Sequence, residues 1–139
     1  MLAFAVAVAL LTNTPSPDKC VAGSEFSPRL CPLVLPRIVS IAVNPTAPDA
    51  LDASPQCNAF KLTPALVKHY FRRAKLTDEG SADGTLIEAG CKATGQVRFA
   101  DGRDAMWSIS QLGVGRLFFA SSERMVMYCG TCRKPFEPQ

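Results

Sequence analysis

The sequence predicts an α+β domain in which one N-terminal helix packs on a four-stranded antiparallel meander and disulfide bonds brace the structure. Three observations predict it: apolar residues at helical spacing after Thr63, strand-like alternation with turns after residue 90, and six cysteines. The chain has 139 residues, of which 47% are hydrophobic and 19% charged. That length and composition are typical of one folded globular domain.

The helix is predicted to begin at Thr63-Pro64, where a hydroxyl can cap the helix and proline fits the first helical position. It is expected to run from Ala65 to about Leu76. One face carries apolar side chains at helical spacing, and we expect this face to be buried: Leu66, Val67, Tyr70, Phe71 and Ala74. Residues 77–90 are rich in turn formers and predict a loop, with a short strand at Leu86-Ile87.

Residues 91–99 alternate between apolar and polar side chains, which is typical of a strand with one buried face. Asp101-Gly102 then predicts a tight hairpin. The second strand directs Ala105, Trp107 and Ile109 inward, and glycines 113 and 115 mark the next turn. Residues 116–120 and 125–129 complete the meander. A sheet curved against the helix would bury five aromatic side chains together: Tyr70, Phe71, Phe99, Trp107 and Phe119.

The segment before the domain is rich in proline. Proline removes a backbone donor and fixes φ, so this density argues against a long helix or a central strand. Only residues 33–43 are strand-like, and residues 44–56 read as a linker. We therefore predict an extended segment and linker over 20–56 and the α+β domain over 57–139. Eight of the eleven prolines lie in residues 15–55: Pro15, Pro17, Pro28, Pro32, Pro36, Pro45, Pro48 and Pro55.

Residues 2–11 form an unbroken apolar run that is too short to span a bilayer and matches the central part of a signal peptide. No Lys or Arg precedes the run, and no clear cleavage site follows it. The other interpretation is a buried strand or helix of a cytosolic protein. Six cysteines favour export, because disulfides persist in oxidising compartments. We predict a signal peptide over 1–19 and a periplasmic or secreted protein.

Residues 57–136 resemble a group of small secreted proteins of Gram-negative bacteria that have no assigned function. The resemblance implies a periplasmic or surface location. It supplies no substrate, cofactor or catalytic residue. The residues that carry it are Cys57-Asn58-Ala59-Phe60-Lys61-Leu62-Thr63, Val67, Tyr70-Phe71, Cys91, Gly95, Phe99-Ala100-Asp101-Gly102-Arg103, Trp107, Ile109, Tyr128-Cys129 and Cys132.

The six cysteines are candidates for three disulfides. Cys20 and Cys31 are expected to pair locally within the proline-rich segment. We expect one of Cys129 and Cys132 to bond to Cys57 and the other to Cys91, which would fasten both ends of the domain. Each such bridge would close a loop of tens of residues and stabilise the domain by about 3–4 kcal/mol.

Cys129 and Cys132 also form a C-x-x-C motif, which can be a redox pair or half of a zinc site. Redox pairs of the thioredoxin type lie at a helix N-terminus. Here the motif follows a predicted strand, and Pro135 lies shortly beyond it. A zinc site would need His69 and Cys57 or Cys91 as further ligands. Structural disulfides are the simpler interpretation.

No catalytic constellation is evident. His69 is the single histidine, lies within the predicted helix and has no acidic neighbour in the sequence. A basic patch is predicted along the helix, at Lys68, Arg72, Arg73 and Lys75. Such a patch is commonly a solvated helix face, and it can also contact anionic lipid, lipopolysaccharide or an acidic protein. The net charge of +3 is too small to argue for nucleic acid.

These observations favour a non-catalytic binding or accessory module of the periplasm, of the inhibitor or immunity type, with no cofactor or metal. Its partner would be another protein, and the anionic envelope surface is a further candidate. The alternative is a thiol–disulfide or metal-handling protein that uses Cys129 and Cys132. The sequence leaves the ligand and the oligomeric state open.

Overall fold

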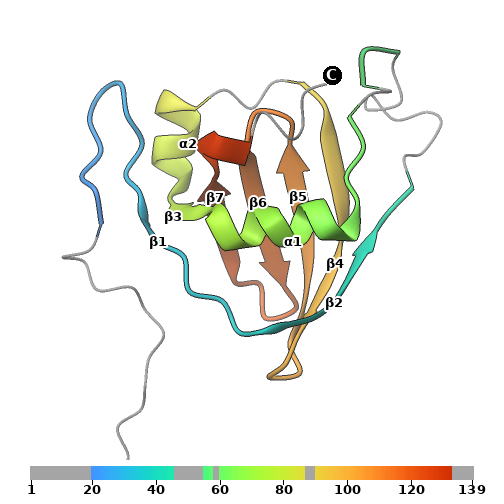
Figure 1. The fold of residues 1–139 in the computed structure, drawn as a ribbon. Helices are drawn as coiled ribbons and strands as arrows, with labels where there is room; N and C mark the ends of the chain where they lie inside the picture. Colours follow the sequence, from blue (N-terminus) through green and yellow to red (C-terminus); the bar gives the residue numbers. More distant parts are fainter. Residues whose placement is uncertain (1–19, 46–54, 58–59, 87–89, 133–139) are drawn as a thin grey trace, which may run out of the picture.

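The structure is a computed structural model that describes residues 20–45, 55–57, 60–86 and 90–132. A seven-stranded antiparallel sheet has the order β1-β3-β7-β6-β5-β4-β2, and α1 crosses one of its faces (Figure 1). The predicted signal peptide over 1–19 and most of the predicted linker lie outside the described residues. The elements are β1 (Cys31–Pro32), β2 (Ile38–Val43), η3 (Pro55–Cys57), α1 (Pro64–Arg73), β3 (Lys75–Thr77), α2 (Glu79–Thr85), β4 (Lys92–Phe99), β5 (Asp104–Ser110), β6 (Val114–Phe119), β7 (Arg124–Tyr128) and η4 (Gly130–Cys132).

Strands β4 to β7 form the meander that the alternation predicts, and each pairs with the next along the chain. The β4–β5 hairpin turns at Asp101-Gly102. Gly102 has a φ of +89°, which glycine adopts without steric cost. The Asp101 carboxylate accepts a hydrogen bond from the backbone N–H of Arg103 at 3.1 Å. Local turn chemistry therefore fixes this hairpin.

The predicted four-stranded sheet is wrong, because three further strands extend it to seven. Two of them come from the proline-rich segment: β2 pairs with β4 at one edge, and β1 pairs with β3 at the other. Proline density did not prevent this pairing. Residues 38–43 are free of proline and long enough for a strand. Pro32 lies in a two-residue strand at the sheet edge, where a missing N–H is tolerated.

The predicted helix is confirmed from Pro64 but ends at Arg73, before the expected end near Leu76. Ala74 is extended (ψ 149°), and the chain continues directly into β3, which pairs with β7. The predicted loop over 77–90 contains a second helix, α2. Asp78 caps it by accepting a hydrogen bond from the backbone N–H of Ser81 at 2.6 Å. The signal for this helix was an aspartate followed by Glu79 in the first turn.

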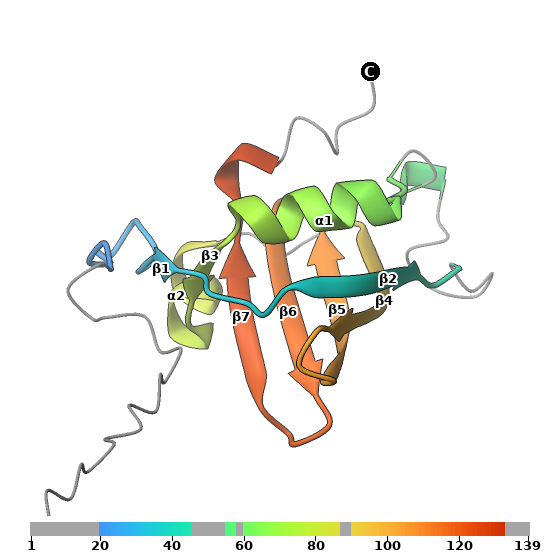
Figure 2. The same cartoon turned by 60° about the horizontal axis from the view of Figure 1, so that its bottom comes forward.

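The core lies between α1 and the sheet, and Figure 2 shows α1 lying over one face of the meander strands. The predicted aromatic cluster is confirmed, and Trp107 at its centre is 1% exposed. The Trp107 indole Nε1 donates to the Gln96 carbonyl at 3.1 Å. Burial raises the pKa of Tyr70, and its neutral hydroxyl donates to the Gly113 carbonyl at 2.8 Å. Both buried polar groups therefore have partners, as close packing requires.

Three disulfides brace the described chain, and one of the three predicted pairings is confirmed. Cys20 bonds to Cys31 as expected, within a loop closed by backbone hydrogen bonds between Val21 and Leu30. The two predicted bridges to the C-terminal cysteines are wrong. Cys57 bonds to Cys91, which joins the approach to α1 to the start of β4.

Candidate functional site

The most distinctive surface lies on the sheet face opposite α1. Side chains alternate along each strand, so those between the core residues point to this second face. The strand register then aligns one side chain from each of five neighbouring strands. We call this set the central row: Ala42, Gln96, Met106, Phe118 and Arg124.

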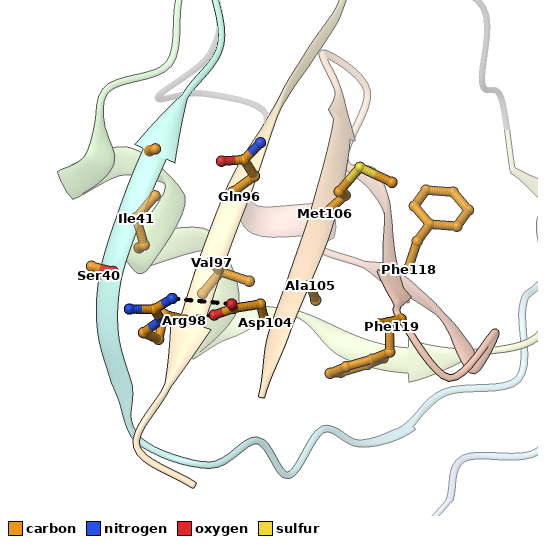
Figure 3. A pocket seen from close by; sticks show the side chains of 12 residues that line it. Ser40, Ile41, Gln96, Val97, Arg98, Asp104, Ala105, Met106, Phe118 and Phe119 are labelled. Carbon is orange, nitrogen blue, oxygen red and sulfur yellow. Dashed lines mark hydrogen bonds and ion pairs between the residues drawn. The ribbon is translucent and has the colours of Figure 1, made fainter. Parts of the chain in front are cut away.

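The central row crosses a shallow hollow of about 480 Å³ on β2, β4, β5 and β6. Figure 3 shows Gln96, Met106 and Phe118 standing on one side of the strands. Met106 is 59% exposed, and Phe118 beside it is half-buried. Strands β4 and β5 form the floor of the hollow at Val97 and Ala105. The hollow is lined by Ser40, Ile41, Ala42, Gln96, Val97, Arg98, Asp104, Ala105, Met106, Phe118, Phe119 and Ala120.

One end of the hollow carries a fixed ion pair. The Arg98 guanidinium donates from Nε and Nη2 to the two carboxylate oxygens of Asp104, at 2.9 and 3.2 Å. This hydrogen bonding from Arg98 holds the pKa of Asp104 below its usual range. Both side chains are exposed, so the pair adds little stability. It instead presents one donor group and one acceptor group beside the apolar surface.

At the β7 end of the central row, Arg124 contacts the Phe118 ring, and Arg124 and Arg116 both interact with Glu79 of α2. The Arg124 guanidinium lies 5.9 Å from the centre of the Phe118 ring. Glu79 of α2 accepts hydrogen bonds from Arg116 at 3.0 and 3.1 Å, and its carboxylate lies 3.4 Å from the Arg124 Nε. Hydrogen bonding from Arg116, with the charges of both arginines, lowers the pKa of Glu79. The cation–π contact with Arg124 therefore supports the Phe118 ring from one side.

The residues that line the hollow combine apolar side chains with one ion pair, and they include neither histidine nor cysteine. Among the described residues, no three side chains of the His, Cys, Asp and Glu types gather as metal ligands would. His69, the single histidine, lies on α1 and therefore across the sheet from the hollow. The hollow presents the exposed thioether of Met106, the ring of Phe118 and the Arg98–Asp104 ion pair at its rim.

The C-x-x-C motif lies elsewhere, at the junction of β7 and η4. Cys129 and Cys132 bond to each other, contrary to the predicted pairing with Cys57 and Cys91. Their exposed fractions are 2% and 0%, because both belong to the core beneath α1. Thiol exchange needs access of the attacking thiolate to a sulfur, and the folded domain gives little.

The predicted basic patch is divided. Lys68 and Arg72 lie on successive turns of α1 and are exposed, as is Arg73. Lys75 lies in β3, because α1 ends before it. Lys68 and Arg72 instead adjoin Arg37, which sequence reasoning did not single out.

Sequence reasoning also missed the central row. The available signal was Met106, an apolar side chain between Asp104 and Ser108 on the outward face of its strand. Placing Phe118 and Arg124 beside it requires the register of β5, β6 and β7, which the sequence did not provide.

No family model, curated protein or solved structure matches the chain. Within the described ranges, none of the helices is both long and apolar enough to span a bilayer. The three disulfides indicate an oxidising environment outside the cytoplasm.

Proposed function

We propose that this protein is a non-catalytic binding module of the bacterial periplasm, of the inhibitor or immunity type, and that it binds a protein through the central row. One observation carries the proposal: Met106 is exposed beside Phe118 in a hollow on the sheet face opposite α1. Single exposed apolar residues are ordinary on protein surfaces, but a hollow formed by several of them is not.

The chemistry of the hollow favours a protein partner. Methionine, aromatic residues and arginine are enriched in protein interfaces, and the row contains all three. Methionine adapts its shape to a partner side chain, while the arginine above Phe118 keeps the ring in place. The floor is an open sheet rather than an enclosed cavity with converging polar groups, which a small molecule would need. We expect an apolar anchor of the partner to lie on Met106 and Phe118.

The charged rim adds specificity. Arg98 and Asp104 supply both signs of charge beside the row, two residues along β4 and β5 from Gln96 and Met106. A partner that places an acidic side chain beside Arg98 and a basic side chain beside Asp104 would complement them. A partner with the reverse arrangement would be repelled. The inhibitor or immunity type of protein requires this kind of selectivity without catalysis.

The periplasmic location is part of the proposal. It is supported by the apolar run over residues 2–11 and by the oxidising compartment that the disulfides indicate. The resemblance of residues 57–136 to small secreted proteins of Gram-negative bacteria agrees with this location.

A thiol–disulfide function is the second candidate, because Cys129 and Cys132 are bonded to each other. Burial of both sulfurs weighs against it. Resistance of this bond to glutathione in the native protein would separate the two functions.

Site-specific photocrosslinking in a Gram-negative host tests the proposal. A photoreactive residue replaces Met106 in the full chain, and the control replaces Phe26, which is also apolar and is 85% exposed on the N-terminal loop. We expect one discrete protein adduct from position 106 and none from position 26. The partner is then identified by mass spectrometry, purified and mixed with the protein to rebuild the complex. Equal adducts at both positions, or none at position 106, would overturn the proposal.

A further inference from the structure

A second concave surface lies on the α1 side of the molecule. Residues 33–37 run from β1 to β2 beside α1, as Figures 1 and 2 both show. The groove between this segment and α1 has a volume of about 490 Å³. We call it the strap groove, and it is lined by Leu33, Leu35, Pro36, Arg37, Ile38, Lys68, Phe71 and Arg72.

Three cations converge on the strap groove from two separate segments. Arg37 comes from the strap, while Lys68 and Arg72 come from adjacent turns of α1. All three are exposed, and none has an ion pair or side-chain hydrogen bond within the part of the chain that the structure describes. Like charges brought together repel one another, so the fold gains nothing from this arrangement by itself.

The arginines of the meander behave differently. Arg98, Arg103, Arg116 and Arg124 each pair with a carboxylate on β5, on α2 or in the β4–β5 turn. These four arginines therefore have counter-charges within the described chain, whereas the three cations that converge on the strap groove have none there. The convergence of three cations on one groove is what suits it to an external anion.

The groove is also partly apolar. Leu33, Leu35 and Ile38 are partly exposed and line the groove together with Phe71. Val34 on the same strap is 45% exposed. A ligand that matches this surface carries a negative group for the cations and a hydrocarbon part for the apolar side chains. Phospholipid combines both in one molecule, and cations beside apolar side chains are typical of proteins that lie on membrane surfaces.

We infer that the strap groove binds the phosphate headgroup of an anionic phospholipid, and that it docks the α1 side of the protein on a membrane surface. Arg37, Lys68 and Arg72 contact the phosphate, and the strap leucines contact the upper acyl chain. Because α1 and the central row lie on opposite faces of the sheet, docking leaves the protein-binding hollow accessible. The inference is independent of the proposed function.

Vesicle sedimentation with the full chain tests the inference. Vesicles of phosphatidylcholine alone give the baseline, and vesicles that also contain phosphatidylglycerol give the signal. The groove variant is Arg37→Gln/Lys68→Gln/Arg72→Gln. The matched control is Lys61→Gln/Arg73→Gln/Lys75→Gln, which removes the same charge from exposed positions that do not line the groove. Tryptophan fluorescence confirms that each variant is folded.

We expect the parent to bind the anionic vesicles above the baseline and to lose this binding as salt is added. The groove variant should bind about a hundredfold more weakly, while the control stays within a fewfold of the parent. Equal losses in both variants would reduce the effect to net charge and overturn the site. A parent that ignores vesicles but binds glycerol phosphate or polyglutamate would move the ligand to a soluble phosphate or an acidic protein, and would overturn the membrane assignment.

Discussion

Gly95 offers the sharpest test of how the core is packed. It lies on β4 directly opposite Trp107 of β5, on the face that α1 covers. A Cβ added at this position would overlap both the Trp107 ring and the Ala42 carbonyl of β2. Neither neighbour can yield easily. The indole is buried, and its Nε1 donates a hydrogen bond to the Gln96 carbonyl. The Ala42 carbonyl belongs to the backbone of β2.

Gly95→Ala should therefore destabilise the domain by the larger part of the usual overpacking range, about 3 kcal/mol. For a domain of this size the melting temperature would fall by about 10 °C. Urea denaturation followed by the fluorescence of Trp107, the single tryptophan, measures the loss.

Gly84→Ala is the matched control, because no atom lies within 4 Å of its added Cβ and it sits within α2. Alanine is the better helix former, so this variant should match the parent or gain up to about 1 kcal/mol. A Gly95→Ala protein as stable as the parent would refute the packing of Trp107 against β4.

Three further predictions concern Trp107, Glu79 and the Cys129–Cys132 bond. Trp107→Ala should cost about 3–5 kcal/mol of stability, and acrylamide should quench the native tryptophan weakly, because the side chain is buried; free quenching would contradict this. The pKa of Glu79 is lowered in the fold, so its contribution is present at neutral pH and lost as the pH falls through that lowered value. Glu79→Gln should accordingly weaken the dependence of the urea midpoint on pH in the acid range. An unchanged dependence would contradict the stabilisation of the Glu79 carboxylate by Arg116. The Cys129–Cys132 bond should resist glutathione in native buffer because both sulfurs are buried, and rapid reduction there would favour the thiol–disulfide function.

The local patterns of the sequence predicted the meander and the helix start well. Alternation along residues 91–99 placed Val97 and Phe99 in the core, and Thr63-Pro64 marked the start of α1. These features depend on neighbouring residues, which the sequence displays directly. The early end of α1 was harder to predict. Ala74 continues the helical spacing, yet it is extended because the chain passes directly into β3, which pairs with β7.

Long-range pairing was beyond prediction from one sequence. Strand β2 joins the sheet from a proline-rich segment because it finds β4, more than fifty positions later in the chain, as its partner. Cysteine spacing likewise gave no reason to prefer the Cys57–Cys91 bond. The central row depends on the register of five strands, and a slip of one residue would turn Met106 into the core. The candidate site is therefore a product of topology.

The binding role of the central row is tested most directly by the dissociation constant of the complex rebuilt from purified components. Met106→Glu places a charge in the centre of the hollow, and Phe26→Glu makes the same kind of change on the exposed N-terminal loop. Loss of an interface hot spot weakens binding by at least about 30-fold. We predict a loss of that size for Met106→Glu with no change for Phe26→Glu, both variants being folded. An unchanged dissociation constant for Met106→Glu would contradict the proposed function.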